Sequence, residues 1–183
     1  KLSQKQKIDE IKILRFNSYN SKWKKHFYNK KIKDHDDFSS VSECKNLKNL
    51  CVHGSSINDL SPFKNLINLT ELNINKAKIE NIKPIEKLFN LTSLDLSENL
   101  IKDLSSLRFL SSLSSLYLSK NKIANQSDLS VLGKLLRLKT LKIDGNPLND
   151  LSKLPKMQSL VNIRIDSKQM GNAQDLLKHP NLI

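Results

Sequence analysis

One apolar pattern recurs six times in this chain of 183 residues, and it constrains the fold more than any other feature. Leucine or a similar residue fills the first, fourth and sixth places of each copy, and the eleventh place is again apolar. The copies begin at Leu47, Leu69, Leu91, Leu113, Leu138 and Leu160. Successive starts differ by 22 residues, except for one step of 25 between the fourth and the fifth. Such a period predicts a solenoid in which each copy packs against its neighbours.

Each copy predicts one short β-strand and one return segment. The fourth and sixth places lie two residues apart, and side chains two apart share a face of a strand. A single strand cannot bury that face, so neighbouring copies are expected to stack into a parallel sheet. The return segment has apolar residues three apart, as in Leu60, Phe63 and Leu66. Because three is the period of a 3₁₀-helix, the return is expected to hold short 3₁₀ segments.

The predicted fold is therefore an α/β solenoid of the leucine-rich repeat class, right-handed and curved. Its parallel sheet would form the concave face, and 3₁₀ or short helices the convex face. Residues 38–183 are predicted to form the solenoid, because Phe38, Val41 and Cys44 repeat the return spacing one period earlier. Residues 181–183 fall where a further repeat would start, so the solenoid is either truncated there or closed by a short cap.

The ninth place of the pattern has a predicted structural role. It holds Asn99, Asn121 and Asn146 in three of the copies, and an asparagine amide donates and accepts hydrogen bonds at once. We expect these amides to satisfy backbone groups that the turn after the strand would leave unpaired inside the solenoid. Ala77 fills the same place without a polar side chain.

The copy of 25 residues carries its extra residues after Ile123. The stretch that follows suits a helical turn or two, with Ser127 or Asp128 as the N-cap. We interpret it as a tolerated insertion on the convex side.

Residues 1–37 are predicted to form a separate basic unit, either an N-terminal cap or a degenerate repeat. The chain carries a formal net charge of +13. Residues 1–46 hold 12 Lys and Arg against 6 Asp and Glu, which is an excess of 6 in the first quarter of the chain. The spacing of Ile8, Ile11 and Ile13 is that of the strand half of the pattern, out of register with the other copies.

The densest basic stretch, residues 22–33, mixes lysine with aromatic residues and has two interpretations. In the first, the aromatic side chains cover the open end of the core while the lysines stay in water, as in a cap. In the second, the stretch binds an anionic ligand, either RNA or an acidic membrane surface. The anion-binding residues would then be Lys22, Lys24, Lys25, Lys30, Lys31 and Lys33.

The two cysteines are expected to remain unpaired. Cys44 takes the place of a convex-side leucine, so its thiol should be buried, whereas Cys51 lies between two core positions of a strand and should face outward. No metal-ligand spacing accompanies them. Since extracellular animal domains of this class commonly end in disulfide-rich caps, we expect an intracellular or a bacterial secreted location.

No sequence motif in the chain points to catalysis. The histidines are scattered, the serines lack the glycine pattern of a nucleophile elbow, and there is no phosphate-binding loop. We therefore expect a monomeric, non-enzymatic protein without cofactor, metal or small-molecule substrate. Three glycosylation sequons begin at Asn68, Asn90 and Asn125, and the first two fall on the repeat consensus itself.

The concave face is the predicted partner-binding surface, because residues between the core positions of each strand point outward. Its charges are mixed, unlike those of a groove that tracks phosphates. Tyr and Arg are frequent anchors of protein interfaces, so Tyr117 with Asp95, Lys142 and Arg164 is the predicted centre. At any one position, a solvated sheet residue without function would look the same. The full predicted set is His53, Asn73, Asn75, Asp95, Ser97, Tyr117, Lys142, Asp144 and Arg164.

The stretches INDLSPFKNLINLTELNINKAKI and FNLTSLDLSENLIKDLSSLRFLSSLSSLYLSKNKI resemble the 22-residue leucine-rich repeats of bacterial internalins and of the phosphatase-regulator-like class. The resemblance covers residues 38–183. It implies a non-enzymatic scaffold that binds a partner protein on the concave sheet, as a bacterial effector or adhesin module. The alternative hypotheses are anionic-ligand binding through residues 22–33 and a structural spacer or targeting arm of a longer protein.

Overall fold

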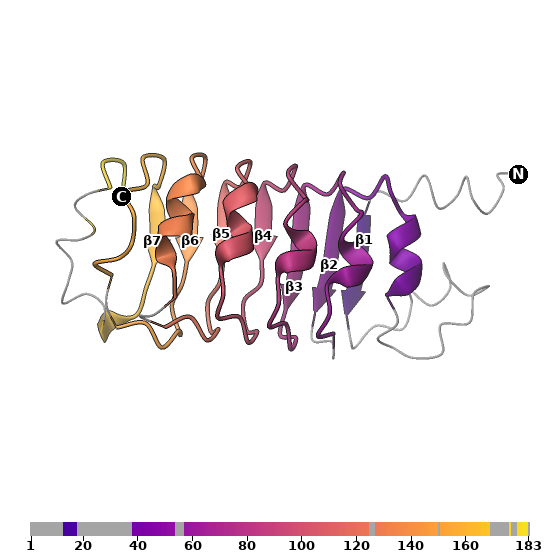
Figure 1. The fold of residues 1–183 in the computed structure, drawn as a ribbon, viewed down its shortest axis with the longest axis horizontal. Coiled ribbons are helices and arrows are strands. Elements are labelled where there is room, and N and C mark those ends of the chain that lie inside the picture. The colour runs from indigo at the N-terminus through magenta and orange to yellow at the C-terminus, as the bar shows by residue number, and fades with distance from the viewer. Residues whose placement is uncertain are drawn as a thin grey trace, which may run out of the picture.

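A computed structural model of the chain shows one parallel sheet backed by a layer of 3₁₀ helices (Figure 1). It describes residues 13–17, 38–53, 57–124, 127–149, 151–168, 176 and 179–182. Seven strands pair in chain order, every pair parallel. They are β1 (Ile13–Asn17), β2 (Asn49–His53), β3 (Glu71–Asn75), β4 (Ser93–Asp95), β5 (Ser115–Tyr117), β6 (Thr140–Lys142) and β7 (Asn162–Arg164). The six copies of the pattern account for β2 to β7, as predicted.

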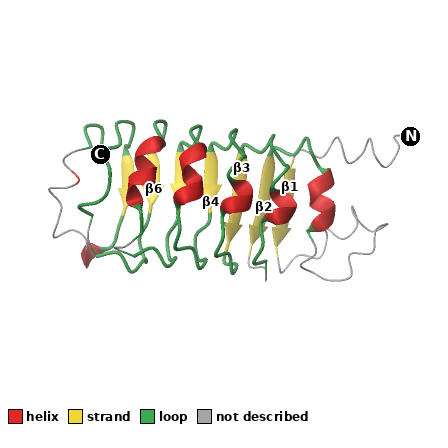
Figure 2. Ribbon diagram, in the orientation of Figure 1, coloured by secondary structure: helices red, strands yellow, loops and turns green. Residues whose placement is uncertain are grey.

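Short 3₁₀ helices lie on the opposite side of the core from the outer face of the sheet (Figure 2). They are η2 (Ser39–Glu43), η3 (Ser61–Phe63), η4 (Lys83–Ile85), η5 (Ser105–Phe109) and η6 (Leu129–Lys134). Their hydrogen bonds join residues three apart, such as the Phe63 amide to the Leu60 carbonyl at 2.9 Å. The prediction of 3₁₀ segments on this side is confirmed.

The insertion after Ile123 lengthens one of these helices. The result is η6, the longest 3₁₀ helix that the structure describes, and Asp128 is its N-cap, as predicted. The Asp128 carboxylate accepts a hydrogen bond from the Ser130 backbone amide at 3.0 Å. Hydrogen bonds from the Ser130 side chain and backbone lower the pKa of Asp128, because they favour the ionised carboxylate.

The hydrophobic core fills the space between sheet and helices as one continuous cluster from Phe38 to Leu160. Along β2, Leu50 and Val52 are buried while the residues between them are only half-buried, which is the alternation expected of a strand with one dry face. Phe63 is fully buried, and its ring packs edge-on against that of Phe38 with centroids 5.8 Å apart. Burying one such side chain stabilises the fold by about 1.5–3 kcal/mol.

Strand β1 extends the sheet into the N-terminal segment. Its register aligns Leu14 with Leu50 and Phe16 with Val52, so Leu14 and Phe16 occupy the fourth and sixth places of the pattern. The register indicated by the spacing of Ile8, Ile11 and Ile13 is therefore not the observed one, since Ile13 pairs with Asn49, and Ile8 and Ile11 lie outside the described residues. The step from Leu14 to Leu50 is 36 residues (50 minus 14), so the 22-residue period could not set the register there. The remainder of residues 1–37 lies outside the described residues.

Three buried asparagines join successive turns of the solenoid. The Asn121 side chain accepts from the Ile101 amide (3.0 Å) and donates to the carbonyls of Leu96 (2.9 Å) and Leu118 (3.1 Å). It thus satisfies backbone groups of its own repeat and of the one before. Two further residues make the same set of bonds, Asn99 and Asn146. The predicted structural role of the ninth place is confirmed.

A second ladder of polar side chains runs where each return segment leads into a strand. Asn90 donates from Nδ2 to the Ile67 carbonyl (2.9 Å), and Thr92 donates from Oγ1 to the Thr70 carbonyl (3.0 Å). Asn68 makes the corresponding bond to the turn before it. Both sequons on the repeat consensus therefore have a structural explanation, since their asparagine and threonine side chains pair with backbone carbonyls.

Replacing Asn121 by Ala should lower the free energy of unfolding by about 2–3 kcal/mol, because the buried Ile101 amide would lose its acceptor and the carbonyls of Leu96 and Leu118 would each lose one of two donors. The midpoint of urea unfolding, at an unchanged slope, measures the loss. The neighbouring Lys122 is exposed, so Lys122→Ala should change stability by less than about 0.5 kcal/mol. Equal effects of the two substitutions would contradict the proposed role of the asparagine.

Candidate functional site

The outer surface of the sheet, here called the sheet face, carries the side chains that alternate with the core positions. Burial alternates in this way along β2, β3, β4, β5 and β6. Cys51 is half-buried on this face and Cys44 is fully buried, and neither forms a disulfide. The predictions for both cysteines are therefore confirmed.

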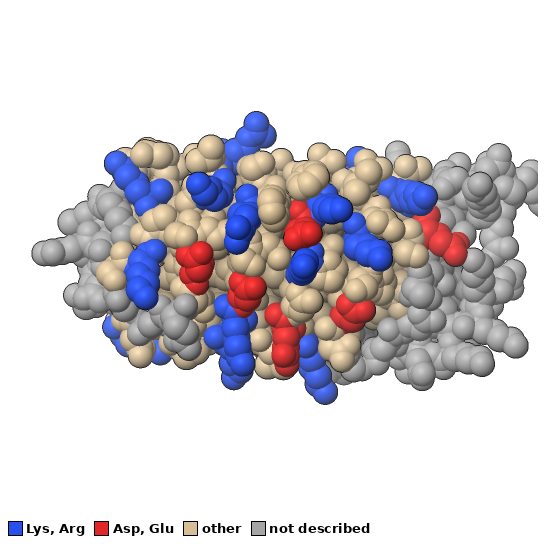
Figure 3. Space-filling view, in the orientation of Figure 1, with Lys and Arg blue, Asp and Glu red and all other residues tan. Residues whose placement is uncertain are grey.

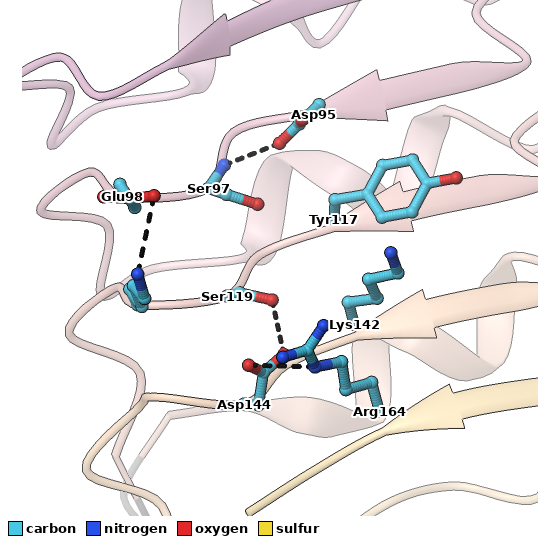
Figure 4. A pocket seen from close by; sticks show the side chains of 9 residues that line it. Asp95, Ser97, Glu98, Tyr117, Ser119, Lys142, Asp144 and Arg164 are labelled. Atoms are coloured by element: carbon cyan, nitrogen blue, oxygen red, sulfur yellow. Dashed lines mark hydrogen bonds and ion pairs between the residues drawn. The ribbon is translucent and has the colours of Figure 1, made fainter.

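One part of the sheet face forms an open hollow of about 330 Å³, here called the charged hollow (Figure 4). It spans β4 to β7 and the turns that follow the first three of these strands. Its lining combines three acidic side chains, three basic ones, two serines and one tyrosine. The lining residues are Asp95, Ser97, Glu98, Tyr117, Ser119, Lys120, Lys142, Asp144 and Arg164.

The charged hollow gathers six of the nine residues predicted to bind a partner: Asp95, Ser97, Tyr117, Lys142, Asp144 and Arg164. The other three do not line it, because His53 lies on β2 and Asn73 and Asn75 lie on β3, nearer the N-terminal end of the sheet. That any of the nine binds a partner stays a prediction.

Three lining residues were not predicted. Ser119 occupies the seventh place of its repeat, like Ser97 and Asp144, so the alternation of the strand could have identified it. Glu98 and Lys120 occupy the eighth place, immediately before a buried asparagine. Strand periodicity does not reach that place, because the backbone leaves the extended conformation there.

Tyr117 and Lys142 come from neighbouring strands and lie side by side in register. The Lys142 ammonium sits 4.9 Å from the centre of the Tyr117 ring, within the range of a cation–π contact. Both side chains are half-buried. Figure 4 shows the ring on the same side as the Lys142 chain, with its hydroxyl directed away from the turns. The pair therefore presents an apolar ring, a hydroxyl and a cation within one small area.

Asp144 holds two other side chains of the hollow. It accepts a hydrogen bond from the Ser119 hydroxyl at 2.6 Å and forms an ion pair with Arg164 Nε at 3.3 Å. Its side chain is only 15% exposed, whereas that of Arg164 is 66% exposed. An ion pair this exposed contributes little to stability. Its main effect is to fix the direction of the guanidinium at the rim of the hollow (Figure 4).

The turn at the eighth place has a left-handed backbone. The φ angle is 53° at Lys76, 58° at Glu98, 55° at Lys120 and 71° at Gly145. The Glu98 carboxylate lies 3.6 Å from the Lys120 ammonium, so charges on successive turns pair across the repeats. A Cβ at Gly145 would lie only 2.7 Å from Lys120 Cγ, so the glycine lets the lysine chain lie against the next turn. The hollow is thus bounded by tightly spaced turns.

The second predicted site, the lysines of residues 22–33, lies outside the described residues. In the described part of the chain, no group of three or more His, Cys, Asp or Glu side chains converges on a point where it could hold a metal ion. The helices of these residues are too short or too polar to cross a bilayer.

Comparison with solved structures supports the fold assignment. An internalin, InlF, from Listeria monocytogenes superimposes with a TM-score of 0.66 at 34% identity over 70% of this chain. The protein is a leucine-rich repeat protein of internalin-like structure. Internalin C2 of the same organism gives 0.64 at 28% identity over 74% of the chain, and a leucine-rich repeat protein of Leptospira interrogans gives 0.63 at 25% over 79%.

This leucine-rich repeat chain spans only part of those proteins: 37% of InlF, 57% of internalin C2 and 38% of the Leptospira protein. No protein-family model and no curated protein sequence matches it.

Replacing Gly145 by Ala should destabilise the solenoid by about 1–2 kcal/mol, because a left-handed φ is unfavourable for a residue with a Cβ. The added Cβ also forces Lys120 out of its place. Thermal unfolding followed by circular dichroism measures the effect. The converse change Lys76→Gly removes the same strain from an exposed position and should leave stability equal or higher. A neutral Gly145→Ala substitution would contradict this account of the turn.

Proposed function

We propose that this protein is a non-enzymatic scaffold that binds a partner protein on the sheet face, with the charged hollow at the centre of the interface. The observation that carries the proposal is that the hollow places a tyrosine, an arginine and charges of both signs on one stretch of a regular sheet. Tyrosine and arginine are the residues most often found at the energetic centre of protein interfaces.

The balance of charge favours a protein over a polyanion. Asp95, Glu98 and Asp144 face Lys120, Lys142 and Arg164, so acidic and basic groups are equal in number around the hollow. A phosphate-tracking surface needs a uniformly positive potential, because its affinity comes from neutralising successive phosphates. Alternating charge instead selects a partner with the complementary arrangement and fixes how it docks.

The side chains of the hollow are held in place before any partner arrives. Asp95 accepts a hydrogen bond from the Ser97 amide at 2.9 Å, and Asp144 holds Ser119 and Arg164. Lys142 rests against Tyr117. Ordering flexible side chains is one of the main costs of association, and here contacts within the free protein reduce that cost. The strands that carry these side chains cannot shift independently, because backbone hydrogen bonds join each strand to the next.

The likeness to internalins is consistent with this proposal. The same binding face would serve in a secreted effector or in a surface adhesin, because both require only a rigid array that presents a specific surface. A partner protein is therefore the expected ligand, and a small-molecule substrate is not.

Tyr117→Ala and Arg164→Glu should each raise the Kd for the partner by at least about tenfold, as expected for residues at the centre of an interface. The partner is first captured from lysate treated with nuclease and identified by mass spectrometry. Its affinity for each purified variant is then measured by calorimetry. Because Tyr117 is half-buried outside the core and Arg164 is exposed, both variants should remain folded, with free energies of unfolding within about 2 kcal/mol of the wild type.

Lys122→Glu is the matched control, since it makes the same change of charge outside the sheet face and should alter the Kd less than about twofold. Unchanged affinity in both Tyr117→Ala and Arg164→Glu would refute binding through the hollow. Capture that disappears with nuclease treatment would point instead to the lysines of residues 22–33.

A further inference from the structure

The edge of the solenoid where return segments lead into strands differs in charge from the rest of the surface. We define this helix-to-strand edge as the two residues before, and the one after, the leucine that starts each repeat. Between residues 45 and 161 these positions hold Lys45, Lys48, Arg137 and Lys139 and no Asp or Glu. The opposite edge, where strands lead into return segments, mixes both signs, as at Lys78 and Glu80.

Most of the large apolar side chains that are exposed lie on this same edge. Within the described residues these are Ile67 (56% exposed), Phe89 (54%), Phe109 (48%) and Leu136 (71%), here called the apolar row. Ile67, Phe89 and Leu136 hold the same place in three repeats, two residues before the starting leucine. Phe109 lies two residues before the corresponding place in the repeat between them. Four successive repeats thus each expose one large apolar group, three of them on the edge and Phe109 beside it at the end of η5.

Further cations flank the apolar row on the helix side. The fourth and fifth residues before each starting leucine, on the helix side of a buried core position, include Lys64, Lys87, Arg108, Lys134 and Lys156, against only two acids, Glu43 and Glu86. The Arg108 guanidinium lies 5.9 Å from the centre of the Phe109 ring, so charge and apolar surface are in contact. In Figure 3 the upper margin of the molecule, where this edge lies, shows blue atoms and no red ones among the residues that are coloured.

Hydrogen bonds within the repeat explain where the aspartates lie, but they do not explain why the apolar row is exposed. Asp59, Asp103 and Asp128 accept from the backbone amide two residues on, at the start of a 3₁₀ helix and thus away from the edge. On the edge itself, the backbone is satisfied by asparagine, serine and threonine side chains, such as Asn90 bonded to the Ile67 carbonyl. The Ile67 side chain has no part in that bond. A polar residue could replace it without loss to the core.

We propose that the helix-to-strand edge binds the surface of an anionic lipid membrane. Cations together with exposed apolar side chains are the two signals that attach a peripheral protein reversibly to acidic lipid. The parallel sheet sets successive strands about 4.8 Å apart, so the apolar row comes from four successive turns spread over at least about 15 Å of the solenoid. Side chains that protrude from successive turns can meet one flat surface, and a lipid membrane offers such a surface.

This attachment would leave the sheet face available. The charged hollow is built from the ends of the strands and the turns after them, whereas the helix-to-strand edge lies at their beginnings. A molecule bound to a membrane through this edge could therefore still present the hollow to a partner protein. The two activities are separable by mutation, because they share no residue.

Sedimentation with lipid vesicles tests the proposal on the whole chain. Binding to vesicles of phosphatidylglycerol and phosphatidylcholine is compared with binding to vesicles of phosphatidylcholine alone. The wild type should bind the anionic vesicles, and binding should weaken as salt rises. The double substitution Arg137→Glu with Lys139→Glu, and separately Phe89→Asp with Leu136→Asp, should each lower the partition coefficient at least about tenfold. Far-ultraviolet circular dichroism checks that each variant is folded.

The matched control is Lys102→Glu with Lys122→Glu, which makes the same change of charge on the opposite edge at two exposed positions. It should bind anionic vesicles within about twofold of the wild type. An equal loss in this control, or wild-type binding by both edge variants, would overturn the proposal. So would a wild type that fails to sediment with anionic vesicles but is retained on immobilised polyglutamate, which would assign the edge to an acidic protein.

Discussion

No repeat of this protein can bury its own apolar face, and every other feature of the structure depends on that constraint. A strand of three to five residues has a face of only one or two core side chains, such as Leu94 in β4 or Leu50 with Val52 in β2, and it gains a dry environment only when a neighbour covers it. The core is therefore one continuous cluster rather than a set of separate ones. Stability is expected to come from the interfaces between repeats rather than from the repeats themselves.

Stacking also determines how the backbone is satisfied and where functional side chains lie. The buried asparagines complete hydrogen bonds between one turn and the next, and that places the left-handed residues Glu98 and Lys120 above one another beside the sheet. Side chains from separate repeats then meet, as Tyr117 and Lys142 do across two strands. The charged hollow and the apolar row are both consequences of the same register, one at the ends of the strands and the other toward their beginnings.

Much of the fold could be predicted, because the period ties sequence position to place in space. The strand positions, the 3₁₀ returns, the role of Asn121 and the burial of Cys44 all follow from a repeat of known length. The prediction failed where the period is broken. Leu14 lies 36 residues before its partner Leu50, and nothing in the spacing indicates that it, rather than Ile11 or Ile13, pairs with that leucine in the sheet. Alternation identified six residues of the hollow but missed Glu98 and Lys120, which follow the strand in a turn.

By itself, the sequence determined which residues face the core, because hydrophobic burial acts on the one-dimensional pattern of each repeat and the period copies the result along the chain. It also determined which residue types line the sheet face. Only the tertiary structure decided which of those residues meet. Three sets of contacts depend on side-chain directions and on the turn backbone. They are the cation–π contact of Lys142 with Tyr117, the bonds of Asp144 to Ser119 and Arg164, and the approach of Lys120 to Gly145. Those are set by packing between repeats, which no single repeat encodes.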